Sequence, residues 1–194
     1  MTQLEIMGAN AKNASVFLRT AGSKKDDALL AIAKALREHS DEIIKANEID
    51  IENGKNAGLT ESLLDRLRLT PERINGMAEG VEQVAALADP IGNVLEGRTL
   101  KNGLNIEKVR VPMGVIGIIF EARPNVTSDA AALCLKAGSA VILRGGKEAI
   151  NSNLAVSEIM RNAVESVGFP KDCIALVKDT SRQSATELMQ LSDY

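Results

Sequence analysis

Residues 115–149, VIGIIFEARPNVTSDAAALCLKAGSAVILRGGKEA, decide the fold of this 194-residue chain. Two short apolar runs, residues 115–120 and 140–143, enclose a segment of small residues that we expect to form a helix over 128–137. Continuous apolar runs of this length are typical of strands buried on both faces of a parallel sheet. The stretch therefore predicts a strand–helix–strand unit.

The same alternation continues towards the C-terminus. We expect a helix over residues 149–167, a third strand over 174–177 and a last helix that Ser181 caps. Alternating strands and helices predict an α/β protein with a doubly wound, Rossmann-like parallel sheet. Such a sheet normally holds more than three strands, so we expect an incomplete sheet with an exposed edge, and a chain that is a fragment.

Helices precede the sheet. Leu29, Ile32, Ala33 and Leu36 recur at the spacing of one helix face, and Ser23 stands where an N-cap is expected. These residues predict an amphipathic helix that buries its apolar side.

A second helix is expected to begin at Thr70 and Pro71, a cap followed by a residue suited to the first helical position. The charged residues 24–27 are interpreted as charges at a helix start. The inward side of the second helix is expected to consist of Ile74, Met77, Val81, Val84 and Leu87.

A hairpin is expected between the helices and the sheet. Residues 94–100 and 104–111 flank Lys101, Asn102 and Gly103, and Asn-Gly predicts a hairpin tip because both residues tolerate positive φ. The apolar alternation of the second arm is imperfect, so we expect a partly exposed strand. The chain then divides into an N-terminal helical part (residues 1–90), a hairpin arm (91–113) and the first half of a Rossmann-like sheet (114–194), without a catalytic domain.

The composition argues against several classes of protein. The chain has 23 Lys and Arg against 26 Asp and Glu, a net charge of −3, whereas nucleic-acid binding needs a basic surface. One histidine, His39, and two cysteines without metal-ligand spacing argue against a metal site and a Ser-His-Asp triad. No apolar run approaches the ~20 residues that span a bilayer, and the N-terminus has no signal-peptide pattern. We therefore expect a cytoplasmic protein with no nucleic-acid or membrane partner.

Candidate binding residues follow the predicted strands, because ligands of open α/β sheets bind at the carboxyl ends of strands. Arg144, Gly145, Gly146 and Lys147 combine two cations with two glycines that allow close backbone approach, which suits a phosphate such as the 2′-phosphate of NADP. The alternative is a tight turn with two solvated charges. No GxGxxG motif follows the first strand, so the standard dinucleotide fingerprint is absent.

Two further candidates follow the first strand. Asn125 could donate a hydrogen bond to a developing oxyanion, or cap the next helix. Arg123 could bind a carboxylate or phosphate as a two-pronged fork, or form a surface ion pair. Cys134 and Cys173 have no neighbouring base in the sequence, so we expect both to be buried rather than nucleophilic.

Residues 108–149, and above all the motifs EARPNVT (121–127) and LRGGKEA (143–149), resemble the gamma-glutamyl phosphate reductase family. This family, also called glutamate-5-semialdehyde dehydrogenases, is a branch of the aldehyde dehydrogenase superfamily. The wider superfamily usually has Pro-Trp-Asn where this chain has Arg123, Pro124 and Asn125. The resemblance runs the length of the chain and implies an aldehyde-dehydrogenase-like fold.

The resemblance also implies a reaction. NADPH would reduce L-glutamyl 5-phosphate to L-glutamate 5-semialdehyde, with release of phosphate, through a thioester on a cysteine, in proline biosynthesis. By position, Asn125 would be the amide that stabilises the oxyanion, and residues 144–147 would bind NADP(H). Arg123 is our own interpretation as a contact to the substrate phosphate or carboxylate.

Homo-oligomers and association with glutamate 5-kinase are implied as well. Members of this family run further than Tyr194, and neither Cys134 nor Cys173 falls at the position of the nucleophile, so we expect the chain alone to be inactive. The alternatives are a non-catalytic nucleotide-binding fragment, a structural remnant that folds by self-association, and an ordinary aldehyde dehydrogenase that forms a free acid.

Overall fold

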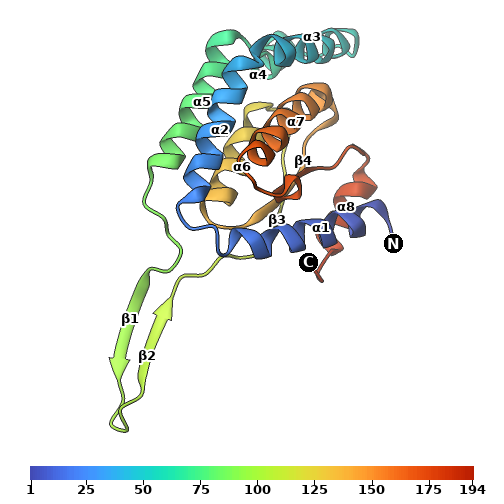
Figure 1. Cartoon of the computed structure of the whole chain (residues 1–194). Helices are drawn as coiled ribbons and strands as arrows, with labels where there is room; N and C mark the ends of the chain where they lie inside the picture. Colours follow the sequence, from blue (N-terminus) through green and yellow to red (C-terminus); the bar gives the residue numbers. More distant parts are fainter.

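A three-stranded parallel sheet with helices on both faces, and a two-stranded arm that projects from it, make up the fold (Figure 1). The computed structural model describes residues 1–194. The helices are α1 (Gln3–Leu18), α2 (Lys24–Glu38), α3 (Ser40–Asn56), α4 (Glu61–Leu67), α5 (Pro71–Ala86), α6 (Asn125–Lys136), α7 (Ile150–Ser166) and α8 (Arg182–Gln190). The strands are β1 (Val94–Thr99), β2 (Asn105–Val109), β3 (Val115–Ile119), β4 (Ala140–Arg144) and β5 (Ile174–Leu176).

The predicted parallel sheet is confirmed, with the strand order β3-β4-β5. α6 and α7 cover one face, and α1 and α8 pack against the other. α2 and α5 form a further layer outside α6 and α7, so the N-terminal helices and the sheet share one core. No helix combines the length and the apolar character that crossing a membrane requires.

The central strand β4 fits the expectation of burial on both faces, and the first strand does not. Residues 140–143 of β4 are all buried, whereas Ile119 of β3 is 43% exposed. The reason is position, because β3 lies at the edge of the sheet, with β4 on one side and no strand on the other. On one face of β3, α8 contributes Leu188, which lies against Gly117.

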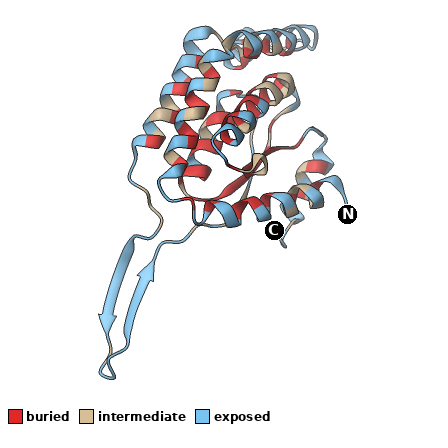
Figure 2. Ribbon diagram, viewed as in Figure 1, coloured by how far each residue is buried: buried red, intermediate tan, exposed pale blue.

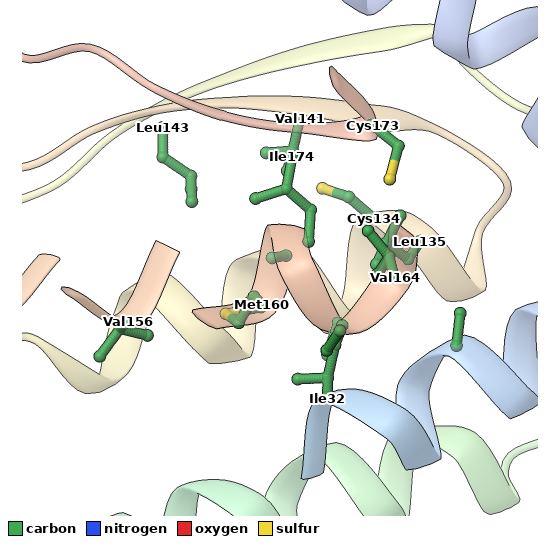
Figure 3. Packing of buried hydrophobic residues seen from close by; sticks show 14 of the residues in the cluster. Ile32, Cys134, Leu135, Val141, Leu143, Val156, Met160, Val164, Cys173 and Ile174 are labelled. Carbon is green, nitrogen blue, oxygen red and sulfur yellow. The ribbon is translucent and has the colours of Figure 1, made fainter. Parts of the chain in front are cut away.

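The core lies between the sheet and the helix layers (Figure 2). The predicted inner face of α2 is confirmed, since Leu29, Ile32, Ala33 and Leu36 are all fully buried. The packing of small and aliphatic side chains between β4 and α7 is seen in Figure 3.

Two of the predicted helix caps are confirmed and one is wrong. The Thr70 hydroxyl accepts a hydrogen bond from the Arg73 amide at 3.2 Å, and the Ser181 hydroxyl accepts one from the Ser184 amide at 3.2 Å. Ser23 makes no side-chain cap, because residues 22–26 form backbone turns in which Ser23 is itself helical.

The inward side of α5 is also shorter than predicted. Ile74, Met77 and Val81 are buried and Val84 is partly buried, but Leu87 is 56% exposed. The reason is that α5 ends at residue 86, and Leu87 lies in the extended chain that leads to the arm.

The hairpin is confirmed, but it is more exposed than expected. Every residue of β1 and β2 is exposed, and the arm stands clear of the body (Figure 2). At the tip the Gly103 amide donates to the Leu100 carbonyl at 2.9 Å, and positive φ occurs at Gly103, at +86°, but not at Asn102. The loop therefore needs one left-handed glycine rather than two tolerant residues.

Two buried lysines join the base of the arm to the core, whereas the sequence predicts only helix-start charges for residues 24–27. Lys25 Nζ lies 2.8 Å from a carboxylate oxygen of Asp89 and donates to the Lys136 carbonyl at 3.1 Å. Lys136 Nζ donates to Asp26 Oδ1 at 2.6 Å and to the Ala85 carbonyl at 2.8 Å. The network ties α2, α6 and the end of α5 together.

Asp89 has a lowered pKa in this network. Burial acts to raise the pKa, but the hydrogen bonds from Lys25 and the Ile91 amide, with the charges of Lys25 and Lys136, outweigh it. A carboxyl with a lowered folded-state pKa stabilises the fold at neutral pH, and this contribution is lost as the pH falls through that pKa.

Lys136→Met is expected to lower the free energy of unfolding by about 3 kcal/mol, because it leaves the Ala85 carbonyl and the Asp26 carboxylate without their buried donor. Urea unfolding followed by circular dichroism measures the change. The matched control is Lys34→Met, whose ammonium is exposed and 3.7 Å from Glu38, with an expected change below about 0.5 kcal/mol. Equally small effects of both substitutions would contradict a stabilising role for the buried network.

Candidate functional site

Two hollows lie beside the segments that follow β3 and β4. The first, the arginine hollow, has a volume of about 420 Å³. The second, the turn hollow, has a volume of about 510 Å³. The arginine hollow is lined most notably by Asp65, Arg66, Arg68, Arg73, Arg123, Asn125 and Asp129. The turn hollow is lined most notably by Leu63, Arg66, Phe120, Arg123, Arg144, Gly146 and Glu148.

Asn125 is the first residue of α6, so the alternative that it caps this helix is wrong. The N-cap position belongs to Pro124, and no side chain caps the helix. Asn125 Nδ2 instead donates a hydrogen bond to Asp129 Oδ2, one helical turn on, at 3.0 Å. Since a side-chain amide has two N–H donors, one remains free to donate into the arginine hollow.

Asp129 holds the Asn125 amide in this orientation. Burial raises the pKa of Asp129, and the hydrogen bond from Asn125 opposes this rise in part. Sequence reasoning missed Asp129, and its signal would have been the four-residue spacing from Asn125 on one helix face.

Arg123 lines both hollows and has no carboxylate within 4 Å, so the alternative of a surface ion pair is wrong. Arg66 also lines both hollows and has no acidic partner within that distance. The two guanidinium groups therefore form no ion pair within 4 Å, although carboxylates line the same hollows.

The other two arginines of the hollow are engaged. Arg73 Nη2 donates to Asp65 Oδ1 at 2.9 Å, and Arg73 Nη1 donates to the Arg68 carbonyl at 2.8 Å. Arg68 Nη2 lies 4.0 Å from Glu61 Oε1. Sequence reasoning missed Arg66, Arg68 and Arg73, because they fall in a helix–link–helix segment without a shared period.

Arg144 holds the loop that follows β5. Its Nη2 donates to the carbonyls of Thr180 at 2.5 Å and Ser181 at 2.8 Å, and its Nη1 donates to the Gly145 carbonyl at 3.2 Å. Its Nε is buried and has no partner. The guanidinium thus joins the ends of two neighbouring strands beside the turn hollow.

Gly145 is a position where a side chain would not fit. A Cβ there would stand 2.2 Å from Asn153 Nδ2 and 3.1 Å from the Phe120 ring. The turn after β4 therefore needs glycine for packing against the protein itself, whereas the sequence suggests glycine there for close approach to a phosphate.

The sequence suggests that Lys147 lines the binding site, but Glu148 does so instead. Lys147 is exposed and lines neither hollow, so the predicted set of residues 144–147 is not brought together as one cluster. Glu148 folds back, with Oε2 2.9 Å from where a Cβ on Gly146 would stand. The turn hollow therefore presents two carboxylates, those of Glu121 and Glu148, as well as the cations Arg66, Arg123 and Arg144.

Neither cysteine belongs to the site. Burial raises the pKa of Cys134 to about 11 and that of Cys173 to about 12. Both sulfur atoms lie within the packed core (Figure 3). His39 is exposed on another part of the chain, and no group of three or more His, Cys, Asp or Glu side chains could hold a metal ion.

A polar pair on α3 positions the segments that line both hollows. Asn47 accepts a hydrogen bond from the Leu69 amide and donates to the Leu67 carbonyl, both at 2.8 Å, which fixes the link between α4 and α5. Asp50 accepts hydrogen bonds from the amides of Asn151 and Ser152, at 3.2 and 2.8 Å, at the start of α7. Both side chains are almost fully buried.

Comparison with known proteins agrees with this architecture. The model of the aldehyde dehydrogenase family matches residues 2–193. The gamma-glutamyl phosphate reductase of Clostridium beijerinckii is 52% identical over 195 residues, which cover 100% of this chain and 47% of that protein. The chain thus spans about half the length of the curated relatives that it matches.

Two crystal structures of gamma-glutamyl phosphate reductases superpose on the whole chain. The enzyme from Thermotoga maritima has a TM-score of 0.97 at 39% identity, with 47% of its chain covered. The enzyme from Saccharomyces cerevisiae has a TM-score of 0.91 at 33% identity, with 50% of its chain covered. The arrangement of helices, arm and sheet is therefore similar to that of these reductases.

Both thiols are expected to react with 5,5′-dithiobis(2-nitrobenzoate) at pH 8 at least about 100-fold more slowly in the folded chain than in denaturant, because burial withholds the thiolate. Absorbance at 412 nm measures the reaction, and Cys134→Ala assigns the two phases. A thiol of the folded chain that reacts as fast as in the denatured chain would contradict the burial of that cysteine.

Proposed function

Because this chain belongs to the aldehyde dehydrogenase family, we propose that it forms the cofactor-binding part of an NADPH-dependent gamma-glutamyl phosphate reductase. The reaction is the reduction of L-glutamyl 5-phosphate to L-glutamate 5-semialdehyde and phosphate, in proline biosynthesis. The observation that carries the proposal is the sequence identity of 52%, over the whole chain, to the reductase of Clostridium beijerinckii.

Asn125 is proposed to stabilise the oxyanion. Addition of a nucleophile to an acyl phosphate, and later of hydride to the resulting thioester, each places negative charge on the same oxygen. The free N–H of Asn125 would donate to that oxygen, while Asp129 holds the amide through the other. Arg123, in the same hollow, would bind an anionic group of the substrate.

The residues around the turn hollow fit a nicotinamide dinucleotide. Gly146 lines the hollow without a side chain, and Leu63 and Phe120 offer an apolar wall. Arg144 lines the hollow, and Lys147, which is exposed outside it, would add positive charge near the turn for phosphate groups. When bound, the cofactor supplies the hydride. A preference for NADP rests on these cations, and the carboxylates of Glu121 and Glu148 oppose it.

The nucleophilic thiolate is proposed to come from a cysteine other than Cys134 and Cys173. A thiol with a pKa of about 11 or 12 is almost wholly protonated at neutral pH, and both side chains face the core. The contribution of this chain is then to bind, orient and stabilise charge.

A chimaera tests the proposal. This chain replaces the aligned segment of the Clostridium beijerinckii reductase, and phosphate-dependent reduction of NADP by glutamate 5-semialdehyde is followed through NADPH absorbance. The chimaera is expected to turn over, and the 194-residue chain alone is not. A folded but inactive chimaera would contradict the proposal, and turnover that does not need phosphate would favour an ordinary aldehyde dehydrogenase.

Asn125→Ala in the chimaera is expected to lower kcat by about 10²–10³, because it removes the donor to the oxyanion. The matched control is Asn162→Ala on the exposed side of α7, which should leave kcat unchanged. Equal kcat values for both variants would exclude the proposed role of Asn125.

Self-association through the arm is part of the proposal. β1 and β2 present apolar side chains such as Leu95 and Ile106 on exposed strands that stand clear of the body (Figure 2). The proposal includes association with glutamate 5-kinase, whose acyl phosphate product would be the substrate here. It also includes a cytoplasmic location, which two unpaired thiols support.

Ile106→Asp is expected to reduce the molar mass measured by light scattering towards that of one chain, because it places a charge in the contact. Glu107→Gln, on the neighbouring position of the same exposed strand, is the control and should leave the molar mass unchanged. Oligomers of undiminished mass in Ile106→Asp would rule out the arm as the contact.

A further inference from the structure

The side chains that line the arginine hollow carry an excess of positive charge. Four guanidinium groups and two carboxylates line it, so the sum of their formal charges is positive. One of the carboxylates, that of Asp65, is already bound to Arg73 at 2.9 Å. The hollow therefore favours an anionic ligand.

Arg66 and Arg123 are the pair that can bind such an anion directly. Neither has a carboxylate within 4 Å, whereas Arg73 is held by Asp65 and Arg68 is oriented towards Glu61. Arginine presents its N–H groups as a planar fork that matches two oxygens of a phosphate or carboxylate. Arg66 from α4 and Arg123 from the segment after β3 would approach an anion from two elements.

We propose that Arg66 and Arg123 bind the phosphoryl group of an acyl phosphate in the arginine hollow, with the acyl carbon beside Asn125. The identity of this ligand as an acyl phosphate rests on the proposed function. In an acyl phosphate, one bridging oxygen separates the phosphoryl group from the carbonyl carbon. The hollow suits that ligand because the same lining holds Arg66 and Arg123 for the phosphoryl group and the amide of Asn125 for the carbonyl oxygen.

The 2′-phosphate of NADP is a second ligand that Arg66 and Arg123 could bind, since both arginines also line the turn hollow. Two observations favour the acyl phosphate. Asn125 lines the arginine hollow but not the turn hollow. The lining of the arginine hollow is also the more positive, with four guanidinium groups and two carboxylates, whereas three guanidinium groups and the carboxylates of Glu121 and Glu148 line the turn hollow.

Asp129 lies in the hollow but forms no ion pair with either cation. Its Oδ2 accepts the hydrogen bond from Asn125. Its charge is outnumbered, because four guanidinium groups and two carboxylates line the hollow, and this excess of positive charge remains for a ligand.

Phosphate binding to the 194-residue chain tests the proposal without any need for turnover. The probes are inorganic phosphate and acetyl phosphate, titrated by calorimetry against potassium chloride of equal ionic strength. Both are expected to bind saturably, and Arg66→Gln and Arg123→Gln are each expected to raise Kd at least about tenfold. Arg19→Gln, at an exposed and unpaired arginine that follows α1, is the matched control and should leave Kd unchanged.

Folding of the variants is checked by thermal unfolding in chloride, where Tm should not change because Arg66 and Arg123 are exposed. The proposal is overturned if phosphate binds no better than chloride, or if both variants bind it as the unaltered chain does. It is also overturned if the two variants weaken NADP relative to NAD but leave acetyl phosphate unaffected, since the pair would then bind the cofactor.

The outcome separates this proposal from the proposed function. An active chimaera with no phosphate binding at the pair would remove the proposal and leave the reductase function standing. Phosphate binding that depends on Arg66 and Arg123, with a folded but inactive chimaera, would keep the anion site and remove the reductase function.

Discussion

A buried carboxylate on α3 fixes the geometry on which both hollows depend. Asp50 accepts four hydrogen bonds at the start of α7, from the backbone amides and the side chains of Asn151 and Ser152, at 2.6 to 3.2 Å. Burial of a charge is costly unless donors satisfy it, and here they do so at a helix N-terminus, which itself favours an anion. Because α7 follows the turn after β4 directly, this contact sets where Gly145, Gly146 and Glu148 lie.

Asn47, one turn earlier on the same helix, does the same for the opposite wall. Its amide bonds to the backbone of Leu67 and Leu69 and to the Ser152 hydroxyl, so it links the α4–α5 segment to α7. Arg66 and Arg68 alternate with these two anchored residues in the sequence. Arg66 can therefore face outwards without an ion pair, because the backbone that carries it is held from behind by contacts that its own side chain does not make.

Sequence pattern predicted the parts of the fold that depend on local burial. The face of α2, the strand β4 and the Thr70 cap each follow from periodicity or from one residue type, and all are confirmed. Sequence pattern could not predict the edge position of β3, which depends on strand order. It also could not identify Asp50 as a cap, because its partners lie about 100 residues away.

For the site, the sequence predicted individual residues but not how they group in space. Strand ends pointed to Asn125, Arg123 and Arg144, but the spatial grouping did not follow from the motif. Arg144 is occupied by carbonyls of the loop after β5, and Lys147 turns to solvent while Glu148 turns inwards. Since exposed guanidinium groups bind anions weakly in bulk water, Arg66 and Arg123 gain strength only where water is excluded. The two arginines, on the wall between the hollows, would then hold a phosphoryl group most firmly when ligand fills both sides.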